Sequence, residues 1–146
     1  MEWANSLKTF EVTQFGAINI CQFVGRQMAD QGDPPAGAGN YKILLISSVM
    51  AEHSHLLPSS TAYCMAKASL DSMTKSLASG LAQHQINVNC IHPGWIDTPA
   101  EREVASDAEI SVMARNLPFG IGKPDDVAKV QSPPTAPARH RWRRSG

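Results

Sequence analysis

Two short and almost wholly apolar runs constrain the fold of this chain more than any other feature. The first is YKILLISSV, residues 41–49, and the second is INVNCIHPG, residues 86–94, which Pro93 and Gly94 stop. A continuous apolar run of this length, bounded by turn residues, is typical of a strand that is covered on both faces, as in a parallel sheet. Residues 43–48 and 87–92 are therefore predicted to form adjacent parallel strands.

Helical periodicity surrounds both runs. Residues 10–30 and 61–82 each carry apolar or small side chains at helix spacing, and a hydroxyl among residues 59–61 is available to cap the second segment. Further helices are predicted with Asp107 in a first turn and with Pro124 at a first position. This order of helices and strands predicts a layered α/β fold with the two long helices on one face of a parallel sheet.

The composition is that of an ordinary globular protein in a reducing compartment. Hydrophobic residues make up 42% and charged residues 18% of the 146 residues, and the formal net charge is zero. Such a balance provides no field that would steer the chain to nucleic acid or to an anionic membrane. The longest aliphatic run, residues 43–46, is far too short to span a bilayer, and no secretory signal is visible. The cysteines form no Cys-x-x-Cys pair, which favours buried thiols and a cytoplasmic location.

The composition changes after residue 130. Residues 131–146 are rich in proline and contain four arginines but no acidic residue. We therefore predict a domain over residues 1–130 and a disordered tail over residues 131–146, because so short a segment with one tryptophan cannot bury a core. Binding of nucleic acid by a basic tail is the alternative, and the disordered tail is the interpretation that we favour.

Tyr63 and Lys67 lie four residues apart near the start of the second long helix, so one helix face carries both. A cation beside a phenol stabilises the phenolate, as a general acid–base group requires. Taken alone, the pair favours a structural interpretation, a tyrosine at the rim of the core beside a lysine that reaches solvent. Its context favours function, because Ser48 and residues 93–98 follow the two strands, and ligands bind at the carboxyl ends of parallel strands.

Three motifs make the chain resemble the short-chain dehydrogenase/reductase family. They are LLISSV (44–49), YCMAK (63–67) and INVNCIHPGWIDTP (86–99), and they occur in the family's order. The resemblance implies a Rossmann-like, three-layer α/β fold with a parallel sheet. It also implies hydride transfer between NAD or NADP and a small carbonyl or alcohol substrate. The stretch PGWIDTPAE is most similar to glucose 1-dehydrogenase and 3-oxoacyl carrier-protein reductase members.

The family's functional residues carry over position by position. The resemblance implies that Tyr63 donates or accepts the proton, and that Lys67 lowers its pKa and holds the nicotinamide ribose. Ser48, with Ser47 as the alternative, would hydrogen-bond the substrate oxygen. The implied cofactor-binding residues are Tyr63, Lys67, Pro93, Gly94, Ile96 and Thr98, and the implied pocket residues are Met113 and Leu117. In the family, helices equivalent to residues 10–30 and 61–82 form the subunit interface, which implies a homo-oligomer.

The chain also departs from the family pattern. No strand is followed by a Gly-x-x-x-Gly-x-Gly turn, the feature that holds the cofactor pyrophosphate, and residues 131–146 stand where the last strand is expected. Thr13 occupies the position of the family's asparagine. These departures predict that the chain is an incomplete copy of a short-chain oxidoreductase, one that lacks the N-terminal cofactor half and the last strand. His53 and His55 do not predict a metal site, because two ligands lack a third.

Two functions therefore stay open. The first is a truncated NAD(P)-dependent oxidoreductase that acts on a small carbonyl or alcohol, with no nucleic acid or membrane as partner. The second is a non-catalytic remnant or interaction module that keeps the dimer interface of the two long helices. Neither the substrate nor the choice between NAD and NADP can be read from these motifs, because the residue that sets the latter belongs to the absent half.

Overall fold

The computed structural model describes residues 3–34, 40–52 and 60–131. His53, His55 and Ser59 lie outside these ranges, as do residues 132–146, so the predicted boundary at residue 130 stays a prediction. The chain divides into two compact units, residues 1–94 and 95–146, which are described separately below. In the ranges that the structure describes, no helix is both long and apolar enough to cross a membrane.

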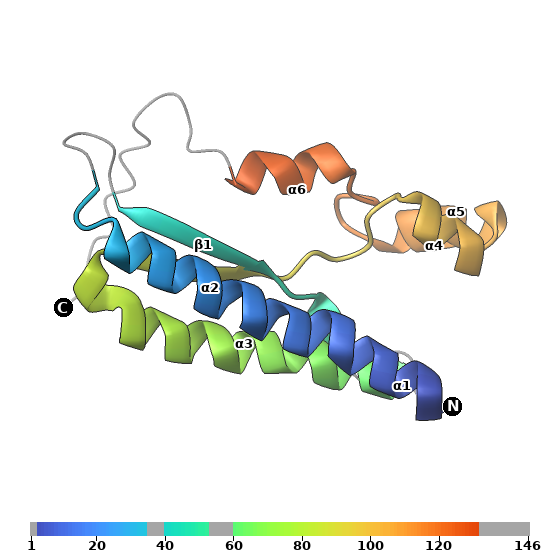
Figure 1. Cartoon of the computed structure of the whole chain (residues 1–146). Helices are drawn as coiled ribbons and strands as arrows, with labels where there is room; N and C mark the ends of the chain where they lie inside the picture. Colours follow the sequence, from blue (N-terminus) through green and yellow to red (C-terminus); the bar gives the residue numbers. More distant parts are fainter. Residues whose placement is uncertain (1–2, 35–39, 53–59, 132–146) are drawn as a thin grey trace, which may run out of the picture. The chain divides into compact units, whose positions relative to one another are not determined.

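A long helical segment opens the first unit (Figure 1). It comprises α1 (Trp3–Thr9), a π-helical turn (Phe10–Phe15) and α2 (Gly16–Asp30), and the backbone stays helical at both junctions. The segment ends before Gly32, whose φ of 72° lies in the left-handed region that glycine adopts at helix ends. The predicted helix over residues 10–30 is confirmed, but it begins earlier and contains a π-turn that the sequence pattern did not indicate.

The sheet of the first unit consists of two parallel strands, β1 (Tyr41–Ile46) and β2 (Ile86–Ile91). Tyr41 pairs with Ile86 at one end of the ladder and Ile46 pairs with Ile91 at the other. The predicted adjacent parallel pairing is confirmed, with each strand starting one or two residues earlier than expected. A parallel pair needs a crossover connection, and α3 (Thr61–Leu81) provides it.

The core of the first unit lies between one face of this sheet and the two helices α2 and α3. Its buried residues are Cys21 from α2, Leu45 from β1, and Ile86 and Val88 from β2. Figure 1 shows α2 and α3 side by side along the strands, as the right-handed crossover rule requires. Gly25 permits this approach, because a Cβ atom at that position would lie 3.2 Å from Leu81 Cδ1.

The face of the sheet opposite α2 and α3 is less covered than the face that packs on these helices. Buried and exposed residues alternate along β2, and Asn87 and Asn89 are exposed. On β1, Ile46 is 41% exposed. The prediction of strands covered on both faces is therefore wrong for β2: its asparagines occupy the period-2 positions that point away from α3.

The second unit contains three helices, α4 (Pro99–Val104), α5 (Asp107–Asn116) and α6 (Pro124–Gln131). Ser106 caps α5 in a capping box with Glu109, and α6 begins at Pro124 as predicted. Ile96 and Gly122 form a parallel bridge, in which a Cβ atom on Gly122 would lie only 2.7 Å from Ile96 Cδ1. A larger residue at position 122 would therefore require the end of the Ile96 side chain to move.

Candidate active site

The carboxyl ends of β1 and β2 lie side by side beyond the last paired strand residues. Ser47 N donates to Ile91 O at 2.9 Å, and Val49 N donates to Pro93 O at 3.1 Å. These two hydrogen bonds extend the ladder, so Ser48 and Pro93 sit at the same edge of the sheet. This edge is the place where ligands bind in open parallel α/β sheets.

The two adjacent serines at this edge have different partners. Ser47 is buried, and its hydroxyl donates to the backbone carbonyl of Lys67 at 3.0 Å. Ser48 has extended backbone angles, and its oxygen accepts from Met50 N at 3.2 Å, which caps a short 3₁₀ turn over residues 49–51. Ser47 thus ties β1 to α3, and the hydroxyl of Ser48 lies at the strand end.

Tyr63 and Lys67 lie on one face of α3, as their spacing predicts. The ammonium nitrogen of Lys67 lies 5.6 Å from the centroid of the Tyr63 ring, which is cation–π range. Lys67 Nζ also donates to the carbonyl of Ile46 at 2.8 Å, so the lysine bridges the start of α3 and the end of β1. Tyr63 is 39% exposed, which leaves its ring accessible from solvent.

The environment of Lys67 changes its proton affinity. Burial lowers the pKa of Lys67 below its ordinary value because the charged ammonium loses water, and the nearby thiol of Cys90 acts in the opposite direction. Lys67 also lines an open groove of about 390 Å³ between the π-helical turn and β1. Thr13, the residue at the position of the family's asparagine, lines the same groove. The structure therefore brings Thr13 and Lys67 to one groove.

The residues of the 93–98 loop divide between the two units. Pro93 and Gly94 end the first unit, directly after the extended ladder. Ile96 and Thr98 belong to the second unit, in which Thr98 Oγ1 accepts from Glu101 N at 3.3 Å and caps α4. The cap uses one lone pair of the Thr98 hydroxyl oxygen, and the hydroxyl proton can be donated to another acceptor.

An ion pair holds this loop against α4 within the second unit. Arg102 donates to both carboxylate oxygens of Asp97, at 2.7 and 2.9 Å, and to Asp107 at 3.3 Å. Of the two predicted pocket residues, Leu117 is half-buried after α5, and the side chain of Met113 lies outside the described residues.

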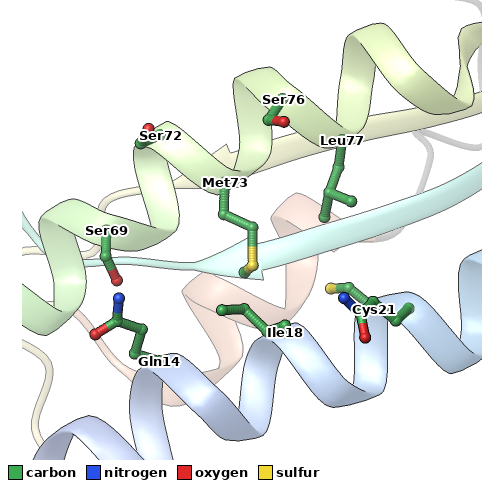
Figure 2. Close-up of a pocket in the computed structure, with 9 residues that line it drawn as sticks. Gln14, Ile18, Cys21, Ser69, Ser72, Met73, Ser76 and Leu77 are labelled. Atoms are coloured by element: carbon green, nitrogen blue, oxygen red, sulfur yellow. The ribbon is translucent and has the colours of Figure 1, made fainter.

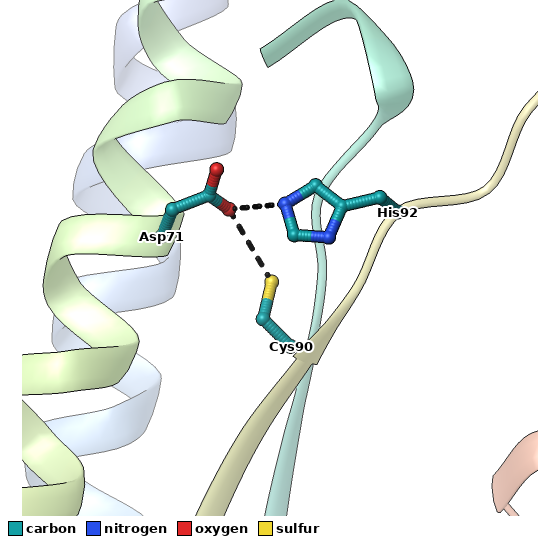
Figure 3. A group of neighbouring side chains, drawn as sticks. All are labelled: Asp71, Cys90 and His92. Carbon is teal, nitrogen blue, oxygen red and sulfur yellow. Dashed lines mark hydrogen bonds and ion pairs between the residues drawn. The ribbon is translucent and has the colours of Figure 1, made fainter. Parts of the chain in front are cut away.

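A further group of side chains near this edge escaped the sequence analysis. Asp71 stands one helical turn after Lys67, and it contacts Cys90 and His92 at the end of β2 (Figure 3). The local signal was present, because Tyr63, Lys67 and Asp71 follow one another at four-residue spacing on α3. The contacts themselves join residues 19 and 21 positions apart, and only tertiary packing brings these together.

The chain is similar in sequence to many known proteins. Residues 1–132 match a family model described as enoyl-(acyl carrier protein) reductase. The chain is 34% identical over 116 residues to 3-oxoacyl-[acyl-carrier-protein] reductase of Thermotoga maritima, covering 79% of this chain and 43% of that protein. It is 32% identical over 113 residues to L-xylulose reductase of Mus musculus, covering 77% of this chain and 43% of that protein.

A solved structure shows the same fold. Gluconate 5-dehydrogenase from Burkholderia cenocepacia, in complex with NADP and tartrate, superposes with a TM-score of 0.76 at 25% identity. The match covers 89% of this chain and 48% of that one. The fold is therefore a partial Rossmann-like α/β fold with a small parallel sheet, and the chain spans less than half of the length of each of these three relatives.

Proposed function

This chain belongs to the short-chain dehydrogenase/reductase family, whose members use NAD or NADP, and on that premise we propose that it carries the catalytic half of an oxidoreductase. The proposed reaction transfers a hydride between the nicotinamide and a carbon that bears a carbonyl or alcohol oxygen. The observation that carries the proposal is the placement of Lys67 against both the Tyr63 ring and the end of β1, the strand after which Ser48 follows in the chain.

The donors of the first unit suit the nicotinamide end of a cofactor. An accessible phenol, an ammonium and backbone groups of the residues that follow β2 are suited to hydrogen bonds with ribose hydroxyls and with a carboxamide. When bound, the cofactor supplies or accepts the hydride. No glycine-rich turn is present for its pyrophosphate. The residues proposed to hold the nicotinamide end are Tyr63, Lys67, Pro93, Gly94, Ile96 and Thr98.

Each catalytic side chain has a distinct task in this proposal. The hydroxyl of Tyr63 gives its proton to the substrate oxygen during reduction and takes one back during oxidation. The charge of Lys67 stabilises the phenolate that remains, and its partial burial strengthens this effect because less water screens the charge. Ser48 donates a hydrogen bond to the same substrate oxygen. Ser47 is the weaker candidate, since its hydroxyl is bound to α3.

The names of the relatives support the proposed substrate class. Two of them are reductases of a 3-oxoacyl group and of L-xylulose, and a third is a gluconate dehydrogenase. All three names describe a carbonyl or secondary alcohol on a small or carrier-bound chain. We propose a substrate of this sugar or 3-oxoacyl type in a cytoplasmic setting.

The alternative function, a non-catalytic module that pairs with a second copy, has its own observation. An open groove of about 360 Å³ runs between α2 and α3, and Ile18, Cys21, Met73 and Leu77 line its floor (Figure 2). The same helical segment exposes large apolar side chains, with Ile20 at 65% and Phe23 at 72%. Ile20 lines the groove beside β1 and Phe23 lies next to Arg26, so these side chains extend the exposed apolar surface of α2 beyond the groove between α2 and α3. A second copy that packs on this surface would cover them, and this is the proposed route to a homo-oligomer.

Cofactor titration separates the two functions. We expect NADH or NADPH to show fluorescence enhancement on addition of the folded chain, with affinity in the millimolar range because the pyrophosphate finds no site. Lys67→Ala should abolish the enhancement, and Lys75→Ala, on the same helix but outside the site, should retain it. A folded chain that gives no enhancement at millimolar cofactor would leave the dimer module as the function.

A further inference from the structure

Three potential metal ligands converge at the end of β2. Asp71 Oδ1 lies 2.9 Å from His92 Nε2 and 3.6 Å from Cys90 Sγ. All three ligand atoms lie within 4.8 Å of one another. Figure 3 shows the three side chains pointing to one spot between α3 and β2. From this geometry we propose that Asp71, Cys90 and His92 form a binding site for a divalent zinc-class ion.

The distances suit a tetrahedral ion. Zinc bonds of about 2.3 Å to sulfur and about 2.1 Å to oxygen or nitrogen place tetrahedral S and O ligands about 3.6 Å apart and N and O ligands about 3.4 Å apart. The separation of Cys90 Sγ and Asp71 Oδ1 already has the first value, at 3.6 Å. The His92–Asp71 pair must open by about half an ångström, which a rotation about side-chain bonds provides. A water molecule completes the fourth position.

The charges and the ligand types also favour zinc. A thiolate and a carboxylate carry two negative charges, which balance one divalent cation, and the imidazole binds as a neutral ligand. One sulfur, one nitrogen and one oxygen ligand suit zinc better than magnesium or calcium, which prefer all-oxygen sites. Binding replaces the S–H proton of Cys90 with the metal–sulfur bond and releases that proton to water.

The surroundings support the ligands and also set a cost. The hydroxyls of Ser47 and Thr74 lie beside the carboxyl of Asp71 and the thiol of Cys90, respectively. Both hydroxyls donate their protons to backbone carbonyls of α3, those of Lys67 and Leu70. The side chains of His92 and Asp71 are 31% and 22% exposed, which gives an ion access from solvent. The ammonium of Lys67 lies close enough to interact with Cys90, and its charge opposes the dication. Its hydrogen bond to Ile46 directs the ammonium towards β1.

Cobalt titration tests the site without reference to any enzymatic activity. Chelator-treated protein should bind one equivalent of Co²⁺. Its absorption spectrum should then show a thiolate-to-cobalt charge-transfer band and visible bands with the intensity that is typical of tetrahedral Co²⁺. Zinc should displace the cobalt. Cys90→Ser should remove the charge-transfer band, whereas Cys64→Ala should leave it unchanged. His92→Gln and Asp71→Asn should each weaken binding by about tenfold or more, and His84→Gln, an exposed histidine elsewhere, should not.

Two results would overturn the proposal. One is the absence of a charge-transfer band at a small excess of Co²⁺; the other is a band that survives in Cys90→Ser. If the variants do not fold, X-ray absorption on the zinc-loaded wild-type chain decides, because the site requires one sulfur and three nitrogen or oxygen scatterers. A zinc coordination shell that contains no sulfur atom would exclude the proposed site. None of these outcomes depends on cofactor binding, so the proposed oxidoreductase function stands or falls separately.

Discussion

At the scale of single residues, α3 carries its functional side chains in one row. Tyr63, Lys67 and Asp71 follow at four-residue intervals; the Tyr63 ring contacts Lys67, and the other two side chains contact different partners at the sheet edge. Lys67 reaches the end of β1, and Asp71 reaches the end of β2. The row is a local consequence of helix geometry, but its partners come from the packing of α3 on both strands.

Replacement of the phenol tests the proposed acid–base group. In the chain complemented with a cofactor-binding half, Tyr63→Phe should lower turnover by roughly 10²–10⁴-fold, because general acid–base catalysis contributes about that much. Cofactor binding should persist, since the ring remains. Lys67→Ala should impair both turnover and cofactor affinity. Steady-state kinetics with a parallel binding titration measures both quantities, and a Tyr63→Phe variant with an unchanged rate would leave the pair as a structural feature.

The two adjacent serines provide a matched pair. Ser48→Ala should lower kcat with little change in cofactor affinity, because its hydroxyl is proposed to bind the substrate oxygen. Ser47→Ala should act mainly on stability, because its hydroxyl joins β1 to the backbone of α3 at 3.0 Å. Kinetics and thermal unfolding of both variants distinguish these effects. The reverse pattern would assign the substrate contact to Ser47.

The carboxyl of Asp71 predicts a pH dependence of stability. Burial alone would raise its pKa, but hydrogen bonds from His92 and Cys90 together with the charge of His92 outweigh this, and the pKa lies below its ordinary value. A folded pKa below the unfolded value of about 3.9 stabilises the folded state above that pH. The stabilisation is lost as the pH falls through the folded pKa. The melting temperature should therefore fall less between neutral pH and pH 3 in Asp71→Asn than in the wild type, as thermal unfolding at each pH would show.

At the scale of elements, the contact between α2 and α3 depends on one small residue. Gly25 lies against Leu81, and a Cβ atom there would approach Leu81 Cδ1 to 3.2 Å. A side chain at position 25 would therefore require the end of the Leu81 side chain to shift. Gly80, near the end of α3, has no neighbour within 4 Å of such a Cβ atom. The same residue type therefore has different roles on the two helices.

These two glycines make a controlled comparison of stability. Gly25→Val should destabilise the fold by about 1–3 kcal/mol, because the added methyl groups overpack the helix contact. Gly80→Ala should stabilise it by up to about 1 kcal/mol, because alanine has the higher helix propensity and open space around it. Denaturant unfolding measures both free energies. Equal effects at the two positions would contradict the close approach of α2 and α3.

At the scale of the whole molecule, the apolar surface of the first unit favours association. Ile20, Phe23 and Met65 are more than half exposed on the helix pair, and Ile46 is 41% exposed on β1. Exposed apolar side chains grouped on one pair of helices are typical of an interaction surface. The family resemblance implies the same, because helices equivalent to residues 10–30 and 61–82 form the subunit interface in the family.

Sedimentation velocity tests this expectation. We expect the chain to associate with increasing concentration, and the double substitution Ile20→Glu and Phe23→Glu to shift it towards the monomer. Phe119→Glu is the control, because Phe119 is fully exposed but belongs to the second unit. A wild-type chain that stays monomeric and highly soluble would contradict the proposed homo-oligomer. It would also contradict the prediction that the chain is an incomplete copy of a short-chain oxidoreductase.

The sequence by itself determined the local features of this protein. The apolar runs located both strands, the four-residue spacing placed Tyr63 and Lys67 on one helix face, and the alternation of helices and strands indicated a parallel sheet. Each of these depends on backbone geometry over a few residues. The tertiary structure alone decided which hydroxyl of Ser47 and Ser48 is bound to α3, that Thr13 shares a groove with Lys67, and that Asp71 meets Cys90 and His92. These outcomes depend on how α3 and the π-helical turn pack on the strands, and contacts between residues far apart in the chain leave no periodic pattern in the sequence.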